Sequence, residues 1–240
     1  MTAPVVGVLA GMGPRSTGPF IDLLLEQCRL QYGALHDVDF PKFFICSQPA
    51  PFYEDRATDY AGLESATIEG LLDLERAGAD FAVIACNTAH MYHEAAASQL
   101  SIRVLNMIEI VCADIACNYG VGKIAVVASA DTISSRLYCD ALEATGCNAV
   151  EVTWQTEVNH LLSLVKTGRD PSELCAAWNS IDAKIMASGA DLALIACLDA
   201  SAVVGYRSPS IPHVDAAVTL AARTISTWLS MRQLDKPAEL

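Results

Sequence analysis

The chain has 240 residues, of which 52% are apolar and 18% are charged, so it can bury a sizeable core and is not a disordered chain. The formal net charge of −13, with no lysine or arginine cluster to offset it, would repel a polyanion and argues against a nucleic-acid partner. The apolar runs are too short to span a bilayer, and the start lacks the basic region and cleavage site of a signal peptide. We therefore expect no membrane partner and a cytoplasmic location. Nine scattered cysteines without a C-x-x-C pair fit neither a disulfide framework nor a metal site such as zinc.

Short β-branched runs alternate along the chain with longer amphipathic segments, a pattern typical of parallel sheets covered by helices. The pattern predicts strands near residues 5–10, 42–47, 81–85, 103–107, 123–128, 149–153, 192–196 and 212–214. It predicts helices near residues 17–31, 60–77, 89–98, 108–118, 133–145, 157–167, 171–188, 199–205 and 215–233.

An internal repeat divides this pattern into two halves. The segment AGADFAVIAC at 77–86 aligns without gaps to SGADLALIAC at 188–197, with seven of ten positions identical. Because a repeated βα plan implies repeated architecture, we predict an α/β fold of two similar Rossmann-like lobes, each a parallel sheet flanked by helices. Two further pairs of segments are more weakly similar and occur in the same order. Residues 6–10 resemble 124–128, and residues 106–109 resemble 212–215.

Each predicted lobe carries a cysteine directly after a buried strand. One lobe is predicted to comprise residues 1–112 and 214–240 and to carry Cys86, and the other to comprise residues 113–213 and to carry Cys197. Ligands of parallel sheets bind beyond the carboxyl ends of strands, and the start of a helix favours a thiolate. We expect the two thiols to face each other across an interlobe cleft that forms the active site. The alternative is a pair of inert core cysteines retained from a duplication.

Two opposed thiols suit the inversion of an α-carbon. Inversion removes a proton from one face of the carbon and returns one to the other, which a single fixed base cannot easily do. The pKa of cysteine lies near enough to neutral for both thiol and thiolate to be reached. One thiolate would abstract the proton while the opposite thiol donates one.

The residues around the first cysteine resemble a known family. Ala85-Cys-Asn-Thr-Ala-His90 is similar to the A-C-N-T-x-H signature of the aspartate/glutamate racemase superfamily, the pyridoxal-independent two-cysteine racemases. Gly11-Met-Gly-Pro14 resembles the G-M-G-P loop of the aspartate racemase branch, and the resemblance covers nearly the whole chain in order. It implies an enzyme that needs no cofactor, with Cys86 and Cys197 as its acid/base pair and a small dicarboxylic amino acid as its substrate.

Polar side chains beside the two thiols are candidate substrate ligands. Asn87 and Thr88 would hold the α-carboxylate or cap the following helix. Thr132 ends a segment that resembles the family's A-T-x-G-T loop, and it has the same two interpretations. His90 is either a buried, hydrogen-bonded core residue or a site residue.

The loop after the first strand is a second candidate for carboxylate binding. Gly11, Met12 and Gly13 form a tight turn whose amides suit an anion. Ser16 stands where a dinucleotide fingerprint needs its third glycine, so no nicotinamide cofactor is expected.

Two cations lie in segments that resemble those with which aspartate racemases bind the side-chain carboxylate. Asp55-Arg56 matches part of a P-D-R-T stretch, and Lys166 matches a V-K-x-G segment. Together Arg56 and Lys166 imply a dicarboxylic substrate. The guanidinium of arginine can donate two hydrogen bonds to a second carboxylate, and the ammonium of lysine can help neutralise its charge. Both are otherwise ordinary surface cations.

The main departure from the family follows the second cysteine. The family has C-T-E there, whereas this chain has Cys197-Leu-Asp199. Leu198 removes a hydroxyl expected to bond the substrate. Asp199 either replaces glutamate as the partner of the substrate ammonium or caps a helix.

The predicted function is the interconversion of L- and D-aspartate, with glutamate as a further substrate. One alternative is another chemistry of the superfamily, a decarboxylase or a cis–trans isomerase of a small dicarboxylate, although such relatives tend to lack one cysteine of the pair. The other is a non-catalytic binder of acidic amino acids. Paired lobes of this size often form homodimers, but the sequence marks no interface.

Overall fold

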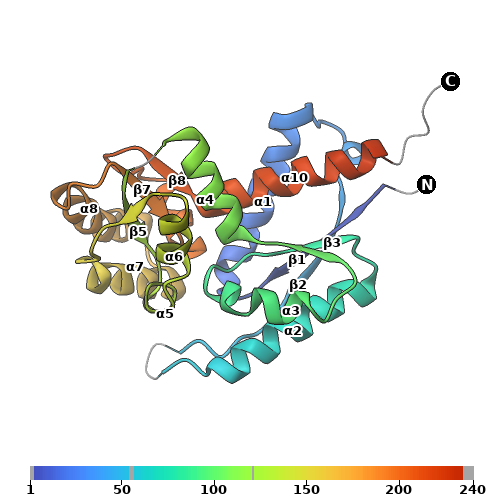
Figure 1. Cartoon of the computed structure of the whole chain (residues 1–240), viewed down its shortest axis with the longest axis horizontal. Helices are drawn as coiled ribbons and strands as arrows, with labels where there is room; N and C mark the ends of the chain where they lie inside the picture. Colours follow the sequence, from blue (N-terminus) through green and yellow to red (C-terminus); the bar gives the residue numbers. More distant parts are fainter. Residues whose placement is uncertain (1–2, 54–56, 121, 235–240) are drawn as a thin grey trace. The chain divides into compact units, whose positions relative to one another are not determined.

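The computed structural model describes residues 3–53, 57–120 and 122–234 (Figure 1). The strands are β1 Val5–Ala10, β2 Lys42–Ser47, β3 Phe81–Ile84, β4 Arg103–Leu105, β5 Lys123–Val127, β6 Asn148–Ala149, β7 Leu192–Ile195 and β8 His213–Asp215. The α-helices are α1 Thr17–Tyr32, α2 Tyr60–Ala77, α3 His93–Ala97, α4 Met107–Asn118, α5 Ala130–Ser134, α6 Leu137–Ala144, α7 Gln155–Thr167, α8 Pro171–Ala187, α9 Leu198–Val204 and α10 Ala216–Leu234. Short 3₁₀ helices are η1 Pro14–Ser16, η2 Asp37–Asp39 and η3 Thr88–Tyr92. Among the helices described, none is both long and apolar enough to cross a membrane.

The first sheet is parallel throughout, with strand order β2-β1-β3-β4. Its central strands β1 and β3 are almost wholly buried, as expected for a sheet covered on both faces. Helices α1 and α10 cover one face, and α2 and α3 cover the other (Figure 1). The indole N–H of Trp228 on α10 donates to the Pro4 carbonyl at 2.8 Å, so the last helix is joined to the entry of the first strand.

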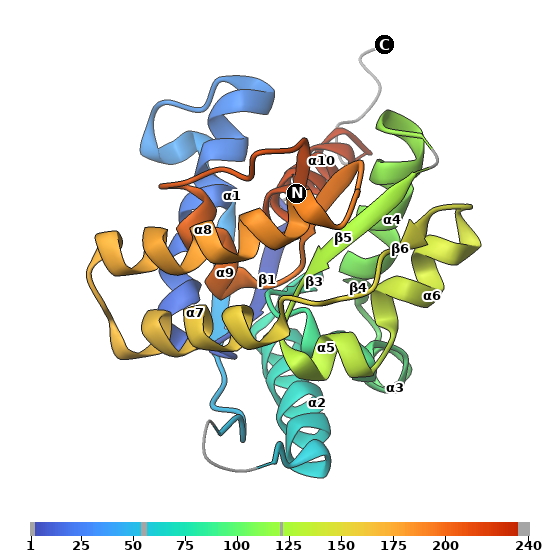
Figure 2. The same cartoon turned by 90° about the vertical axis from the view of Figure 1, so that its left-hand side faces the viewer.

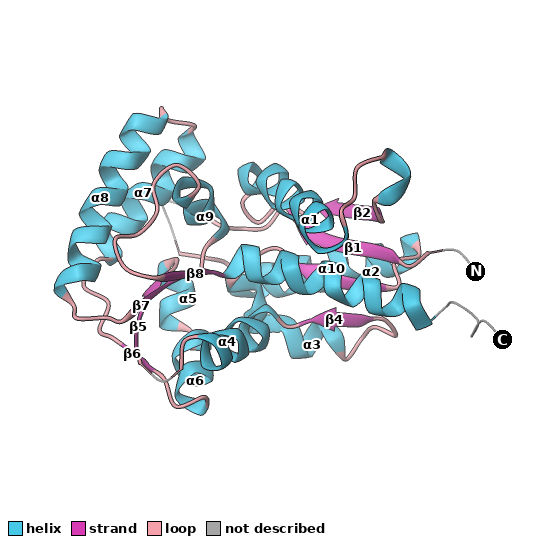
Figure 3. Cartoon of the chain, turned by 90° about the horizontal axis from the view of Figure 1, so that it is seen from above, coloured by secondary structure: helices cyan, strands magenta, loops and turns pink. Residues whose placement is uncertain are grey.

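The second sheet repeats this plan. It is parallel, with strand order β6-β5-β7-β8. Figure 3 shows α7, α8 and α9 on one face of this sheet and α4 and α6 on the other. The predicted α/β class, with two parallel sheets flanked by helices, is therefore confirmed.

The sequence repeat extends to individual hydrogen bonds. Asp80 precedes β3 and accepts the Val5 N–H at 2.6 Å, and Asp191 precedes β7 and accepts the Lys123 N–H at 2.8 Å. Glycines with positive φ follow the helices before these strands, 94° at Gly78 directly after α2 and 68° at Gly189 one residue past the cap of α8. A left-handed residue ends a helix at low cost only when it lacks a Cβ, which explains why both copies keep glycine. The register between the central strands of each sheet is the same in both copies.

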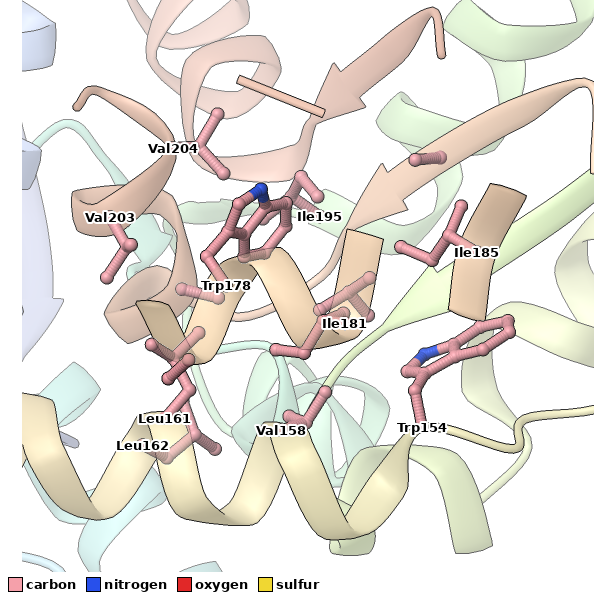
Figure 4. Packing of buried hydrophobic residues seen from close by; sticks show 14 of the residues in the cluster. Trp154, Val158, Leu161, Leu162, Trp178, Ile181, Ile185, Ile195, Val203 and Val204 are labelled. Atoms are coloured by element: carbon pink, nitrogen blue, oxygen red, sulfur yellow. The ribbon is translucent and has the colours of Figure 1, made fainter. Parts of the chain in front are cut away.

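Helices α7 and α8 lie side by side and bury an apolar cluster against the second sheet (Figure 2). Trp154 and Trp178 are fully buried among Val158 and Ile181 (Figure 4). The Trp154 indole N–H donates to the Val126 carbonyl on β5 at 3.1 Å. Complete burial of side chains of this size contributes about 1.5–3 kcal/mol each, so this cluster anchors the helical layer to the sheet.

Contacts divide the described chain into two units. One comprises the described parts of Met1–Ala85, Tyr92–Asn106 and Leu220–Leu240, and the other comprises Cys86–Met91 and Met107–Thr219. The sequence-based division, 1–112 with 214–240 against 113–213, differs from these units at three places: Cys86–Met91, 107–112 and 214–219 belong to the same unit as Cys197. For the first of these segments, the two residues after Cys86 make their side-chain hydrogen bonds within that second unit.

Candidate active site

The two thiols occupy equivalent positions after the central strands β3 and β7. The Ala85 N–H donates to the Leu9 carbonyl at 2.7 Å, and the Ala196 N–H donates to the Val127 carbonyl at 2.8 Å. These bonds extend each ladder by one residue past the strand, so that the next residue, the cysteine, stands where the sheet ends. Cys86 is buried and Cys197 is half-buried.

Burial dominates the electrostatics of both thiols. Desolvation raises the pKa of Cys86 to about 11, while hydrogen bonds from the Ala89 and Thr88 amides act against it. Desolvation followed by the charge of Asp199 raises the pKa of Cys197 to about 12, against hydrogen bonds from the Ala200 and Asp199 amides. The Cys86 charge also raises the Cys197 pKa, so the two groups interact electrostatically. Both are neutral thiols near pH 7 in the free protein, and ionising one disfavours ionising the other.

The side-chain amide of Asn87 is buried, and within the described part of the chain its nitrogen is an unused hydrogen-bond donor. Its side chain is 3% exposed, and its Oδ1 accepts the Tyr138 hydroxyl at 2.6 Å. Among the residues described, Nδ2 of Asn87 finds no hydrogen-bond partner. A buried amide that is satisfied at one end only is costly, which suggests that a ligand completes it.

Three hydroxyls form a cluster next to Asn87. Thr88 Oγ1 lies 2.8 Å from Thr132 Oγ1 and 3.1 Å from Ser129 Oγ, and the latter two oxygens lie 3.0 Å apart. The cap of α5 is Ser129, whose hydroxyl accepts the Thr132 N–H, so Thr132 is not the capping residue. Each hydroxyl has one proton and can turn it from a neighbour to an arriving carboxylate.

His90 braces the first thiol segment. The Met107 N–H can only donate, so Nε2 of His90 accepts from it at 3.1 Å. The imidazole proton is then on Nδ1, which donates to the Cys86 carbonyl at 2.7 Å. His90 therefore connects the thiol segment to the start of α4 as a neutral ring.

The second thiol segment has a brace at the matching position of the repeat. Ser201 Oγ lies 3.2 Å from the Cys197 carbonyl and donates to Asp215 Oδ1 at 2.8 Å, and the same oxygen of Asp215 accepts the Ala217 N–H at 2.8 Å. Burial raises the pKa of Asp215, while the Ser201 hydroxyl and the amides lower it. Ser201 follows Cys197 by four residues, as His90 follows Cys86, so aligning the two halves one turn further would have revealed it.

Leu198 and Asp199 open α9, whose cap position is occupied by Cys197. Asp199 therefore lies inside the first turn and is not the cap. Asp199 is 8% exposed, and its charge raises the pKa of both Cys86 and Cys197. One carboxylate thus acts on both thiols.

The remaining predicted site residues lie elsewhere. Gly11 in the first unit has φ 91°, and a Cβ there would come within 2.6 Å of the Gln48 backbone nitrogen, so this position requires glycine. In the same loop Met12 is buried and Gly13 precedes η1.

Of the two predicted cations, Lys166 is exposed in the last turn of α7, and Arg56 lies outside the described residues. The structure thus groups Cys86, Asn87, Thr88, Thr132, Cys197 and Asp199 within the second unit.

An open surface cavity of about 310 Å³ lies apart from these residues. Its cation, Lys184, pairs with Glu157 at 2.7 Å and donates to the Thr153 carbonyl at 3.1 Å. None of the predicted site residues that the structure describes lines it. Those that do are Val150, Glu151, Thr153, Lys184, Ala187 and Ser188.

Solved structures with this fold include aspartate and glutamate racemases. An aspartate racemase from Picrophilus torridus superposes with a TM-score of 0.81 at 24% identity, covering 97% of this chain and 100% of its own. Glutamate racemase isoform RacE1 from Bacillus anthracis superposes with a TM-score of 0.68 at 19% identity, covering 95% of this chain and 82% of its own. The fold is that of these α/β racemases.

Sequence comparison identifies the family. The family model of Asp/Glu/hydantoin racemase matches residues 9–223. The broad specificity amino-acid racemase RacX of Bacillus subtilis is 36% identical over 227 residues, which cover 94% of this chain and 99% of that protein. The chain belongs to the Asp/Glu/hydantoin racemase family and is an amino-acid racemase, as the resemblance implied.

Proposed function

We propose that this enzyme interconverts L- and D-aspartate without a cofactor, by proton transfer between Cys86, Cys197 and the α-carbon. The observation that carries the proposal is the pair of thiols at equivalent strand ends within one unit, each hydrogen-bonded by amides two and three residues further on. The Cys86 charge raises the pKa of Cys197, so the pair resists double ionisation. This suits a two-base reaction, which needs one thiolate and one thiol.

In the proposed reaction, the thiolate takes the α-proton from one face and becomes a thiol. The electron pair moves toward the α-carboxylate, which Nδ2 of Asn87 and the hydroxyls of Thr88 and Thr132 hold by hydrogen bonds from the moment of binding. The opposite thiol then gives its proton to the other face and becomes the thiolate. Asp199 is the proposed partner of the substrate ammonium. A desolvated thiolate with a raised pKa is a stronger base than one in water, which favours abstraction of a weakly acidic proton.

Two cations support a dicarboxylic substrate. Arg56 and Lys166 lie in segments that resemble those which bind the side-chain carboxylate in aspartate racemases. Replacing Arg56 by alanine should reduce turnover of dicarboxylic amino acids far more than that of alanine or serine.

A second candidate is a racemase of wider specificity. It is favoured by the likeness to RacX, which is described as a broad specificity racemase, and by Leu198 next to the second thiol. An apolar side chain there contributes no directional contact, so it imposes less selection on the substrate.

Chiral chromatography after incubation with single L-amino acids in D₂O distinguishes these candidates. The main proposal predicts D-aspartate with deuterium at the α-carbon, formed without added pyridoxal phosphate and after dialysis against EDTA. Comparable turnover of many neutral amino acids would favour the second candidate. Deuterium uptake at neither aspartate nor glutamate would contradict the main proposal.

A further inference from the structure

Tyr138 is a buried titratable side chain that the reaction scheme does not use. It lies in the first turns of α6 and is 2% exposed. Its hydroxyl donates to Oδ1 of Asn87 at 2.6 Å, across 51 residues of chain. The contact joins α6 to the segment that directly follows Cys86.

This contact sets the orientation of the Asn87 amide. With Oδ1 held by the hydroxyl, the two N–H groups of Nδ2 point away from Tyr138, and among the described residues they have no partner. Rotating the amide by half a turn would bring Nδ2 to the tyrosine oxygen and leave the hydroxyl proton and Oδ1 without a bond. The observed orientation satisfies the tyrosine and leaves a donor for a ligand.

Tyr138 can keep this role over a wide pH range. Burial raises its pKa well above the ordinary value for a phenol, and the charges of Cys112 and Asp215 act in the same direction. The group therefore stays protonated and continues to donate.

We propose that Tyr138 is a positioning residue, which holds the Asn87 amide so that Nδ2 donates to the α-carboxylate of the bound amino acid. The proposal rests on the proposed function in placing a carboxylate beside Cys86. It does not depend on which amino acid is the substrate, because every amino acid has this carboxylate. The hydroxyls of Thr88, Ser129 and Thr132 are the neighbouring donors, so the loss of one contact weakens binding without abolishing it.

A double-mutant cycle tests this role, with the best amino acid found in the racemisation screen as substrate. Tyr138→Phe keeps the ring and removes only the hydroxyl. We expect KM to rise about five- to tenfold, with kcat changed less than KM. Asn87→Ala should raise KM at least as much. Because Tyr138 acts through Asn87, adding Tyr138→Phe to Asn87→Ala should change KM less than twofold.

Tyr32→Phe is the matched control, since Tyr32 also donates a part-buried hydroxyl, to the Asp39 carbonyl at 2.8 Å in the first unit. It should lower the thermal midpoint without changing KM. If Tyr138→Phe lowers the thermal midpoint but leaves KM unchanged, or if the two effects on KM multiply independently, the positioning role is wrong.

A second measurement applies even if Tyr138→Phe fails to fold. With ¹⁵N-labelled asparagine in the wild-type protein, the Nδ2 resonance of Asn87, assigned by its loss in Asn87→Ala, should shift when the amino acid saturates the enzyme. An unmoved resonance overturns the inference. A wild-type enzyme that turns over no amino acid would instead overturn the proposed function itself.

Discussion

The two thiol segments of this protein share a backbone and differ in their side chains. Both follow a central strand in the same register, and both receive amide hydrogen bonds at the sulfur. Beyond the sulfur, the first segment continues with Asn87 and Thr88, which bond to other polar groups, whereas the second continues with Leu198 and Asp199. In the proposed reaction the duplicated fold would supply two equivalent bases, while the divergent residues would distinguish the different substituents of the α-carbon.

The braces behind the thiols show the same division. In the first segment one neutral imidazole joins the Cys86 carbonyl to the start of α4. In the second a hydroxyl and a carboxylate perform the matching task between Cys197 and α10. In both segments the side chain four residues after the cysteine bonds the cysteine carbonyl, but it is an imidazole in one and a hydroxyl in the other. The two copies therefore share the position of this contact and differ in the group that makes it.

The equivalence of the thiols is tested by replacing each in turn. Cys86→Ser and Cys197→Ser should each reduce racemisation by about 10²–10⁴-fold, because each removes an acid/base group that serves one face. The double variant should be little worse than either single one, since the two groups act as a unit. Initial rates from both enantiomers measure this by circular dichroism.

Cys139→Ser and Cys175→Ser are the controls, because both residues are partly buried on helices. They should retain near wild-type rates. A single Cys86 or Cys197 variant that racemises as fast as these controls would rule out the two-base scheme.

The two braces should differ in their contribution to stability. His90→Ala leaves the buried Met107 N–H and the Cys86 carbonyl unpaired, and should lower the free energy of unfolding by about 2–4 kcal/mol. Ser201→Ala should cost only about 1 kcal/mol, because Asp215 keeps its bond from the Ala217 N–H. Urea denaturation of the three proteins gives the comparison. An equal loss of unfolding free energy in the two variants would mean that the His90 imidazole stabilises the fold no more than the Ser201 hydroxyl does.

The missing hydroxyl beside the second thiol is restored by Leu198→Thr. If leucine only weakens binding at that face, turnover in at least one direction should rise by up to about tenfold, the value of one neutral hydrogen bond. Asp199→Asn should act in the opposite direction by removing the charge that pairs with the ammonium. A slower Leu198→Thr together with an unaffected Asp199→Asn would show that this segment contacts the substrate in another way.

The shared carboxylate should influence the thiols unequally. Its charge comes directly after desolvation among the causes of the raised pKa at Cys197 and last among the causes at Cys86, so we expect Asp199→Asn to lower the pKa of Cys197 more. At a pH one unit below the wild-type midpoint, the thiolate fraction at Cys197 should increase roughly two- to fivefold. Titration of the thiolate ultraviolet absorbance, with Cys86→Ser and Cys197→Ser to assign the two steps, measures the change. A lower midpoint at Cys86 alone would contradict the assignment.

Much of the fold could be predicted because local pattern and burial agree. The predicted strands match the observed ones closely where the runs are buried on both faces, as in β1 and β7. The strand predicted at 149–153 is shorter in the structure, Asn148–Ala149, since only these two residues pair with β5 at this edge of the sheet. The predicted helix at 133–145 is replaced by α5 and α6, separated at Arg136, whose φ is 59°. A positive φ at a non-glycine residue depends on its surroundings and has no local signal.

The candidate site divides in a similar way. The thiols and their polar neighbours could be identified because a repeat and a motif mark them in the sequence. Tyr138 and Asp215 could not, because their partners Asn87 and Ser201 lie far away along the chain or in another element. Such contacts arise from the arrangement of helices around the sheet, which a linear pattern does not encode.

The bond between Trp228 and Pro4 also affects how the protein is made. Its partners are 224 residues apart, so the carbonyl at the entry of the first strand must wait for nearly the entire chain to be translated. At ribosomal speeds of about 5–20 residues per second, that delay is about 10–45 s. Residues 107–219 emerge as one uninterrupted stretch and can fold during this time, whereas the first sheet stays without its last covering helix. The first sheet is therefore completed last, and its N-terminal strand stays incompletely covered until the final helix has emerged.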